Sequence, residues 1–170
     1  MFSRIISVAL LGCTLLLVPI AAAAADHGPS TPEERKQALE YIQDFEANPL
    51  GPHAVQEREW VLRWIIEIPD IHVNECVILE LPKGDKKDAS TIFIAETFSQ
   101  AAFLIQNPDK QSDHLAQYQV SVEGALRLYE VLLRANPKDR QPYLDDLIQR
   151  REAGTLAKFV KERAAVACKN

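Results

Sequence analysis

The histidine and carboxylate side chains are the first candidates for chemistry in this sequence. Four histidines are present, and the closest pairings with an acid are His72-x-x-Glu75 and the adjacent Asp113-His114. Histidine and glutamate can act together as general acid and base or as metal ligands. However, no His-Glu-x-x-His or Glu-x-x-His motif occurs. An enzyme site would have to be assembled by folding from dispersed residues, with His72, Glu75 and His114 as the candidates.

Motifs for nucleophilic or phosphate-binding chemistry are missing from the sequence. There is no Gly-x-Ser-x-Gly, no P-loop and no Gly-x-Gly-x-x-Gly, and six glycines leave few positions for a phosphate-cradling loop. The haem-attachment motif Cys-x-x-Cys-His is also absent. We therefore expect no catalytic residue, no metal and no cofactor, and a non-catalytic role is favoured over an enzyme.

Residues 1–25 carry the pattern of a secretory signal peptide. Arg4 is the only charge in this segment, and the mostly apolar stretch after it ends in five alanines, the small side chains that a signal peptidase needs. We expect cleavage between Ala25 and Asp26. Two alternatives stay open: an uncleaved anchor long enough to span a bilayer, and a lipoprotein acylated at Cys13.

The predicted signal peptide determines the net charge and the location expected for the cleaved chain. Removing residues 1–25 takes away Arg4 and no acid, so the formal net charge falls from -5 to -6. A mildly acidic chain without a basic run is a poor ligand for phosphate backbones, so no nucleic acid is expected as a partner. No second long apolar run follows, so no membrane span is expected after cleavage. We predict a periplasmic or secreted protein, with a bacterial envelope favoured.

Cys76 and Cys168 are the two cysteines left after cleavage. An even pair in an exported chain predicts a disulfide, because the compartment beyond the membrane is oxidising. Without a Cys-x-x-Cys motif the bridge is interpreted as structural, and two unpaired buried thiols are the alternative. Closing so long a loop would stabilise the fold by on the order of 4 kcal/mol.

Trp60 and Trp64 lie one helical turn apart, with Arg63 beside them. If exposed, these three side chains could form a stacking face for a sugar or peptide ligand. The alternative is that both rings belong to the core, because a tryptophan can bury 150–250 Å².

Helix signals recur along the mature chain. Thr31-Pro32-Glu33-Glu34 predicts a helix start with a capping box, and apolar side chains then follow at spacings of three and four. The expected helices cover about 32–47, 53–67, 89–106, 113–135, 140–152 and 156–167, with Thr155 as the cap of the last and a solvated loop over 83–88. The 89–106 helix is apolar on much of its circumference, which places it at the centre of a bundle.

Residues 71–81 are ambiguous. Val73, Val77 and Leu81 have helical spacing, whereas Val77, Leu79 and Leu81 alternate as in a strand. A lone strand needs a partner, and no other segment alternates convincingly, so a short helix is predicted.

The predicted fold is all-α: a single domain over residues 26–170, built as a helical bundle or a short helix-pair array of six to seven helices with one disulfide. Asn-Pro stands at three of the expected helix ends, at 48–49, 107–108 and 136–137. The simplest interpretation is that each pair stops a helix, because proline cannot continue the hydrogen bonding.

Three functions remain as hypotheses. The first is an exported non-catalytic module that binds an unknown protein partner or serves the cell envelope. The second is a carrier of a small molecule or metal in the bundle core. The third is a small enzyme using His72, Glu75 and His114. The oligomeric state is not predicted.

Overall fold

A computed structural model of the chain describes residues 27–74, 76–81 and 86–168. These residues form six α-helices and one turn of 3₁₀ helix without a strand, which confirms the all-α prediction. The elements are α1 (Pro32–Ala47), α2 (Ala54–Glu67), α3 (Lys86–Gln106), η1 (Pro108–Lys110), α4 (His114–Ala135), α5 (Pro142–Glu152) and α6 (Leu156–Ala167). In this part of the chain, no helix has the length and apolar character needed to cross a membrane. The predicted signal peptide and its cleavage position between Ala25 and Asp26 lie outside the described residues.

The helix ends follow the local sequence. The Thr31 side chain accepts a hydrogen bond from the Glu34 backbone, and the Glu34 carboxylate accepts one from the Thr31 backbone, so the predicted capping box is confirmed. Three helices, α1, α3 and α4, end immediately before an Asn-Pro pair, as expected.

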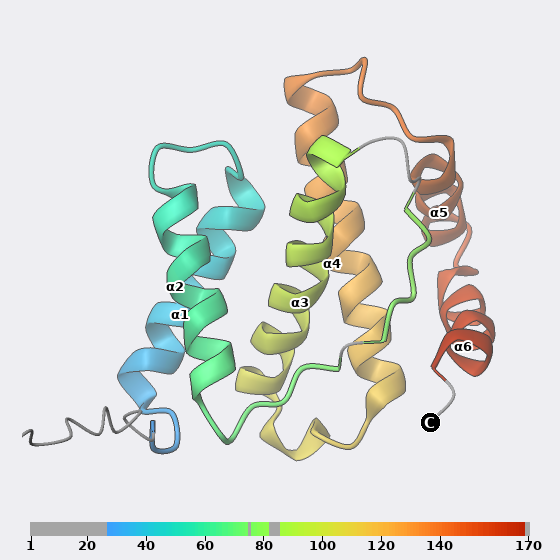
Figure 1. The fold of residues 1–170 in the computed structure, drawn as a ribbon. Coiled ribbons are helices and arrows are strands. Elements are labelled where there is room, and N and C mark those ends of the chain that lie inside the picture. The colour runs from blue at the N-terminus through green and yellow to red at the C-terminus, as the bar shows by residue number, and fades with distance from the viewer. Residues whose placement is uncertain (1–26, 75, 82–85, 169–170) are drawn as a thin grey trace, which may run out of the picture.

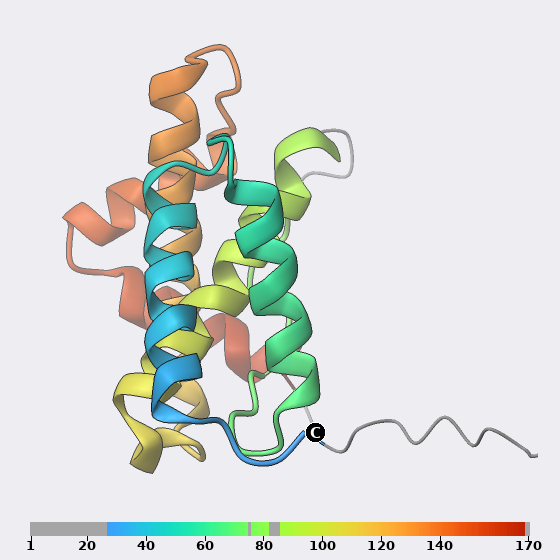
Figure 2. The ribbon, with the colours of Figure 1, turned by 90° about the vertical axis from the view of Figure 1, so that its left-hand side faces the viewer.

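The helices pack in layers around α3 and α4 (Figures 1 and 2). The hairpin of α1 and α2 lies on one side, with α1 contacting both α3 and α4. On the other side, α5 and α6 pack on α4 and on each other. The segment that follows α2 crosses the front of the bundle from α2 towards α5 and α6 (Figure 1).

The core joins all six helices. Phe45 of α1 and Phe98 of α3 meet edge to face with ring centroids 5.2 Å apart, and both are fully buried. The helices α3 and α4 come close at Gly124, where an added Cβ would overlap the Ser99 hydroxyl. The prediction that residues 89–106 lie at the centre is confirmed by the buried positions Ile92, Ala95, Phe98, Ala101 and Leu104.

The short helix predicted over residues 71–81 is wrong. The described residues of this segment form neither helix nor strand. The buried side chains are Ile71, Ile78 and Leu79, whereas Val77, which belonged to the supposed helical stripe, is 54% exposed. The side chains buried most deeply against the bundle are therefore not those of the Val73, Val77 and Leu81 stripe on which the helix prediction rested.

Two smaller expectations about chain ends need correction. The solvated loop expected over 83–88 ends earlier, because α3 already begins at Lys86 and Asp88 is buried. Thr155 occupies the N-cap position of α6, but its side chain makes no capping hydrogen bond. The hydroxyl donates instead to the carbonyl of Arg150, 3.2 Å away, at the end of α5.

Candidate functional site

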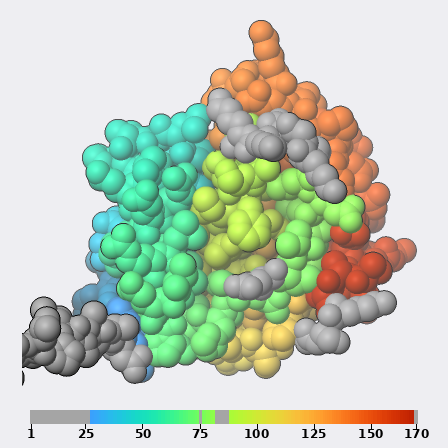
Figure 3. Space-filling view, in the orientation of Figure 1, coloured from blue at the N-terminus to red at the C-terminus, as the bar shows by residue number. Residues whose placement is uncertain are grey.

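A cavity of about 470 Å³ opens between α2, α3 and the segment after α2. In Figure 3 the surface of α3 is visible between α2 and the 71–81 segment. The described lining residues are Leu62, Ile65 and Ile66 of α2, Val73, Asn74 and Cys76 of the segment, Phe93, Glu96, Thr97 and Gln100 of α3, and Ser121 of α4.

One face of α3 supplies the floor of this cavity. Phe93, Glu96, Thr97 and Gln100 follow the spacing i, i+3, i+4 and i+7, which places them on one side of a helix. Other faces of α3 are buried in the core, so the helix fixes the cavity side chains on a rigid support.

Glu96 is the only charged side chain among the described lining residues. It is 5% exposed, and no hydrogen bond or ion pair joins its carboxyl to another described residue. Burial raises the pKa of Glu96 from 4.5 to about 8, because the charged form loses its hydration without gaining a partner. At neutral pH this carboxyl is therefore mainly protonated.

The other polar groups of the cavity are engaged with one another. The Gln100 amide donates to the Ser121 hydroxyl at 3.3 Å and accepts from the Asn74 backbone at 2.9 Å. The Thr97 hydroxyl donates to the Phe93 carbonyl at 3.3 Å. Glu96 is left as the one acidic group with free hydrogen-bonding capacity in the described lining.

The rim of the cavity is apolar and open to solvent. Ile66 is 81% exposed and Phe93 is 49% exposed, although both are large hydrophobic side chains. Both line the cavity, Ile66 from α2 and Phe93 from α3. We refer to these two residues as the apolar rim. Exposed apolar groups gathered at a concave site are typical of a surface that binds something.

The 71–81 segment forms the third wall, and side chains from distant parts of the chain bind it. The Gln111 amide donates to the His72 carbonyl at 3.0 Å, and the Tyr143 hydroxyl accepts from the Glu80 backbone at 3.3 Å. The Arg163 guanidinium of α6 donates to the Ile78 carbonyl at 3.4 Å and to the Glu80 carboxylate at 2.8 Å. These bonds replace the regular ladder that a helix or strand would provide.

The predicted disulfide between Cys76 and Cys168 is present, with the two Cα atoms 5.5 Å apart. Cys76 lines the cavity and Cys168 follows α6 directly. The bridge therefore ties one wall of the cavity to the far side of the bundle.

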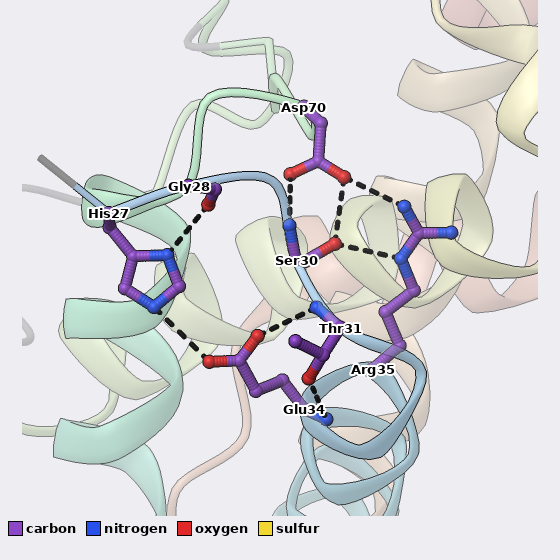
Figure 4. Close-up of polar contacts among 7 residues, drawn as sticks. All are labelled: His27, Gly28, Ser30, Thr31, Glu34, Arg35 and Asp70. Carbon is purple, nitrogen blue, oxygen red and sulfur yellow. Dashed lines mark hydrogen bonds and ion pairs between the residues drawn. The ribbon is translucent and has the colours of Figure 1, made fainter.

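A second carboxyl, Asp70, lies three residues after the end of α2 in a polar cluster with Ser30 and Arg35 (Figure 4). Its oxygens accept from the Ser30 backbone and hydroxyl at 2.8 Å each and from the Arg35 guanidinium at 2.7 Å. Burial acts to raise the pKa of Asp70, but the hydrogen bonds from Ser30 and Arg35 outweigh it and lower the pKa. We call Ser30, Arg35 and Asp70 the Asp70 cluster.

Next to this cluster, His27 extends the capping box of α1 (Figure 4). Its ring bonds the Gly28 carbonyl at 2.8 Å and lies 3.2 Å from the Glu34 carboxylate. The Gly28 hydrogen bond, with the Glu34 charge, raises the pKa of His27. This side chain holds the start of the described chain against α1.

The histidines of the dispersed-site hypothesis are both exposed, and no hydrogen bond joins His72 to His114. His114 begins α4, with its ring 6.4 Å from that of Tyr118. Glu75 lies outside the described residues. No group of three or more potential metal ligands gathers anywhere in the described ranges. The enzyme hypothesis stays a prediction, and the described residues show no hydrogen bond between His72 and His114 that would support it.

The tryptophan pair packs against the protein itself. Trp64 is 3% exposed, and Trp60 is partly buried between Trp64, with ring centroids 5.9 Å apart, and Tyr41, at 5.4 Å. Arg63 is exposed beside them. This geometry corresponds to the core alternative, and a ligand face at Trp60, Arg63 and Trp64 stays a prediction.

Glu96 is a candidate site residue that was not predicted from the sequence. The signal was present, because Glu96 is the only charged residue between positions 89 and 106 of an otherwise apolar helix. A lone acid in such a helix is either exposed at one edge or buried at cost. Only the placement of α2 and the 71–81 segment decides between the two.

Comparison of the chain with protein-family models, with characterised proteins and with solved structures found no match.

Proposed function

We propose that this chain is an exported, non-catalytic binding module that recognises a protein partner through the cavity and its apolar rim. The observation that carries the proposal is the exposure of Ile66 and Phe93 at the mouth of a cavity of about 470 Å³. Large side chains left in water beside a pocket gain free energy when a partner covers them.

The chemistry of the lining supports binding over catalysis. Ser121 accepts its hydrogen bond from the Gln100 amide, which cannot serve as a base. The described lining holds no second acid or base that would give Glu96 a catalytic partner. The oxidised cysteine pair supports an extracytoplasmic location.

A small-molecule carrier is the second candidate, and the cavity volume favours it. A pocket of about 470 Å³ falls within the range of about 300–1,000 Å³ that is usual for small ligands. The two candidate functions differ in what the purified protein should retain: a protein partner for the binding module, and a small molecule for the carrier.

Affinity capture from the native cell envelope tests the proposal. We expect the wild-type protein to retain one stoichiometric protein partner and Ile66→Glu to lose it, because a charge at the rim must be desolvated on binding. Val55→Glu is the matched control: Val55 is also on α2, 53% exposed, and lies outside the cavity lining. Retention by Ile66→Glu equal to that by Val55→Glu, or capture of a small molecule alone, would contradict the proposed function.

A further inference from the structure

The cavity combines two features that rarely occur together: apolar walls and one buried acid without a partner. Apolar contacts come from Leu62, Ile65, Ile66, Val73 and Phe93, and the carboxyl of Glu96 lies among them. An isolated carboxylate in such surroundings is costly, and an opposite charge brought by a ligand removes much of that cost.

The complementary ligand has a cation at the end of an apolar stem. A lysine or arginine side chain has this form, since its methylene groups pack on apolar surface while the charged head binds an acid. A bare metal ion fits less well, because it needs several ligand atoms and the described residues gather no group of three. The negative formal charge of the chain, -5, also favours a basic partner.

We infer that the cavity accepts a lysine or arginine side chain of a protein partner, with its stem between α2 and α3 and its cationic group against the Glu96 carboxylate. This inference rests on the proposed function and names the anchor of the partner. The apolar rim then covers the residues that flank the basic side chain.

No other titratable group in the described lining sets the protonation state of Glu96, so a bound cation can change it. The described lining from α2, from the 71–81 segment and from α4 holds no titratable group, since Cys76 is in the disulfide. On α5, burial raises the pKa of Tyr143, and the Glu96 charge adds to this rise. Glu96 is mainly protonated at pH 7 when the cavity is empty, so binding of a cation should release its proton.

Short peptides test the inference without the partner. The probes are acetyl-Leu-Xaa-Leu-amide with lysine, arginine, acetyl-lysine or norleucine at Xaa, together with free pentylamine. Binding to the full mature protein is measured by NMR titration at pH 7. We expect the lysine and arginine peptides to bind roughly tenfold or more tightly than the two uncharged peptides, because only they form the charge-assisted hydrogen bond.

The variant Glu96→Gln should remove this preference while leaving the binding of the norleucine peptide unchanged. Glu59→Gln is the control, because it deletes one exposed charge on α2 outside the lining. Calorimetry in two buffers with different ionisation enthalpies should show about one proton released per lysine peptide by the wild type, and none by Glu96→Gln.

Each other outcome overturns the inference. Equal binding of the lysine and norleucine peptides would mean that the cavity takes an apolar side chain, and the proposed protein-binding function would stand. Pentylamine binding as tightly as the lysine peptide would point to a free amine as the ligand. Failure of every peptide to bind would also reject the basic anchor, whereas the proposed function is judged separately by loss of the captured partner in Ile66→Glu.

Discussion

Two carboxyl groups whose pKa values are shifted in opposite directions distinguish two regions of this molecule. Asp70 accepts three hydrogen bonds from Ser30 and Arg35, and these bonds lower its pKa. Glu96 has no described partner, and burial raises its pKa to about 8. One acid is satisfied within the chain, and the other has no hydrogen-bond or ion-pair partner among the described residues.

The difference shows that the two carboxyl groups affect the stability of the fold in opposite ways, which supports the binding role proposed for the cavity. The Asp70 cluster connects Ser30, before α1, and Arg35, within α1, to the chain just after α2, so it contributes to the fold at every pH at which Asp70 is ionised. Glu96 opposes the fold whenever it is ionised, because nothing in the chain repays its lost hydration. A group that costs stability and faces a cavity is typical of a binding site.

The largest expected effect is the pH dependence that Glu96 imposes. Its folded pKa of about 8 lies above the ordinary 4.5, so the folded state binds the extra proton and stability falls as pH rises from about 4.5 to about 8. Glu96→Gln should abolish this fall and be more stable than the wild type at pH 9, by up to on the order of 5 kcal/mol. Urea denaturation at pH 5 and pH 9 measures the difference. If the free energy of unfolding depended on pH in the same way in both proteins, Glu96 would not oppose folding, and its predicted difference from Asp70 would be wrong.

Loss of the disulfide should destabilise the region around the cavity more than the Asp70 cluster. The bridge closes a loop with a sequence separation of 92, so the double variant Cys76→Ser with Cys168→Ser should lose on the order of 4 kcal/mol. Hydrogen exchange should rise most in residues 76–81, while the backbone amides of Ser30 and Arg35 keep their protection. Equal loss of protection at both places would show that the two regions are not independent.

Removing the Asp70 charge should lower the stability that the Asp70 cluster contributes. Asp70→Asn weakens the bonds to Ser30 and Arg35 and should cost about 2 kcal/mol at pH 7. Because the folded pKa of Asp70 is lowered, its contribution is present above the unfolded value and is lost as pH falls through the folded pKa, so the variant should lack this acid loss. Asp146→Asn, which breaks an exposed pair with Arg150, is the control and should change little.

The smallest effect is expected at the helix cap beside the Asp70 cluster. Thr31→Ala removes the side-chain half of the capping box and should cost about 1 kcal/mol in chemical denaturation. Thr155→Ala is the matched control, because Thr155 has the N-cap position of α6 without the capping bond. A larger loss at Thr155 than at Thr31 would contradict the assignment of the two caps.

Much of the fold could be predicted from local sequence. The capping box at Thr31, the Asn-Pro stops and the apolar spacing predicted the helices, and the two remaining cysteines predicted the bridge. These signals act over a few residues, or through a covalent bond that the compartment favours. The 71–81 segment failed because its conformation is set by distant side chains, such as Gln111 and Arg163, that have no counterpart in its own spacing.

The candidate site was harder for the same reason. Glu96 could be seen in the sequence as a lone acid in an apolar helix, but the residues that enclose it lie on α2, on the 71–81 segment and on α4. The residues that suggested chemistry by type, His72 and His114, are exposed. Residue type indicated reactivity, whereas enclosure, which depends on tertiary packing, decides where a site can form.

The irregular wall of the cavity has a consequence for how the protein can change over evolution. A helix or strand transmits an inserted residue along its whole length, because every later side chain changes face. The 71–81 segment has no such register, so a substitution at a half-buried lining position such as Val73 can reshape one side of the cavity without altering the helices that hold Glu96. For the proposed binding function, this means that specificity can change on one wall while the acid on the opposite wall is retained.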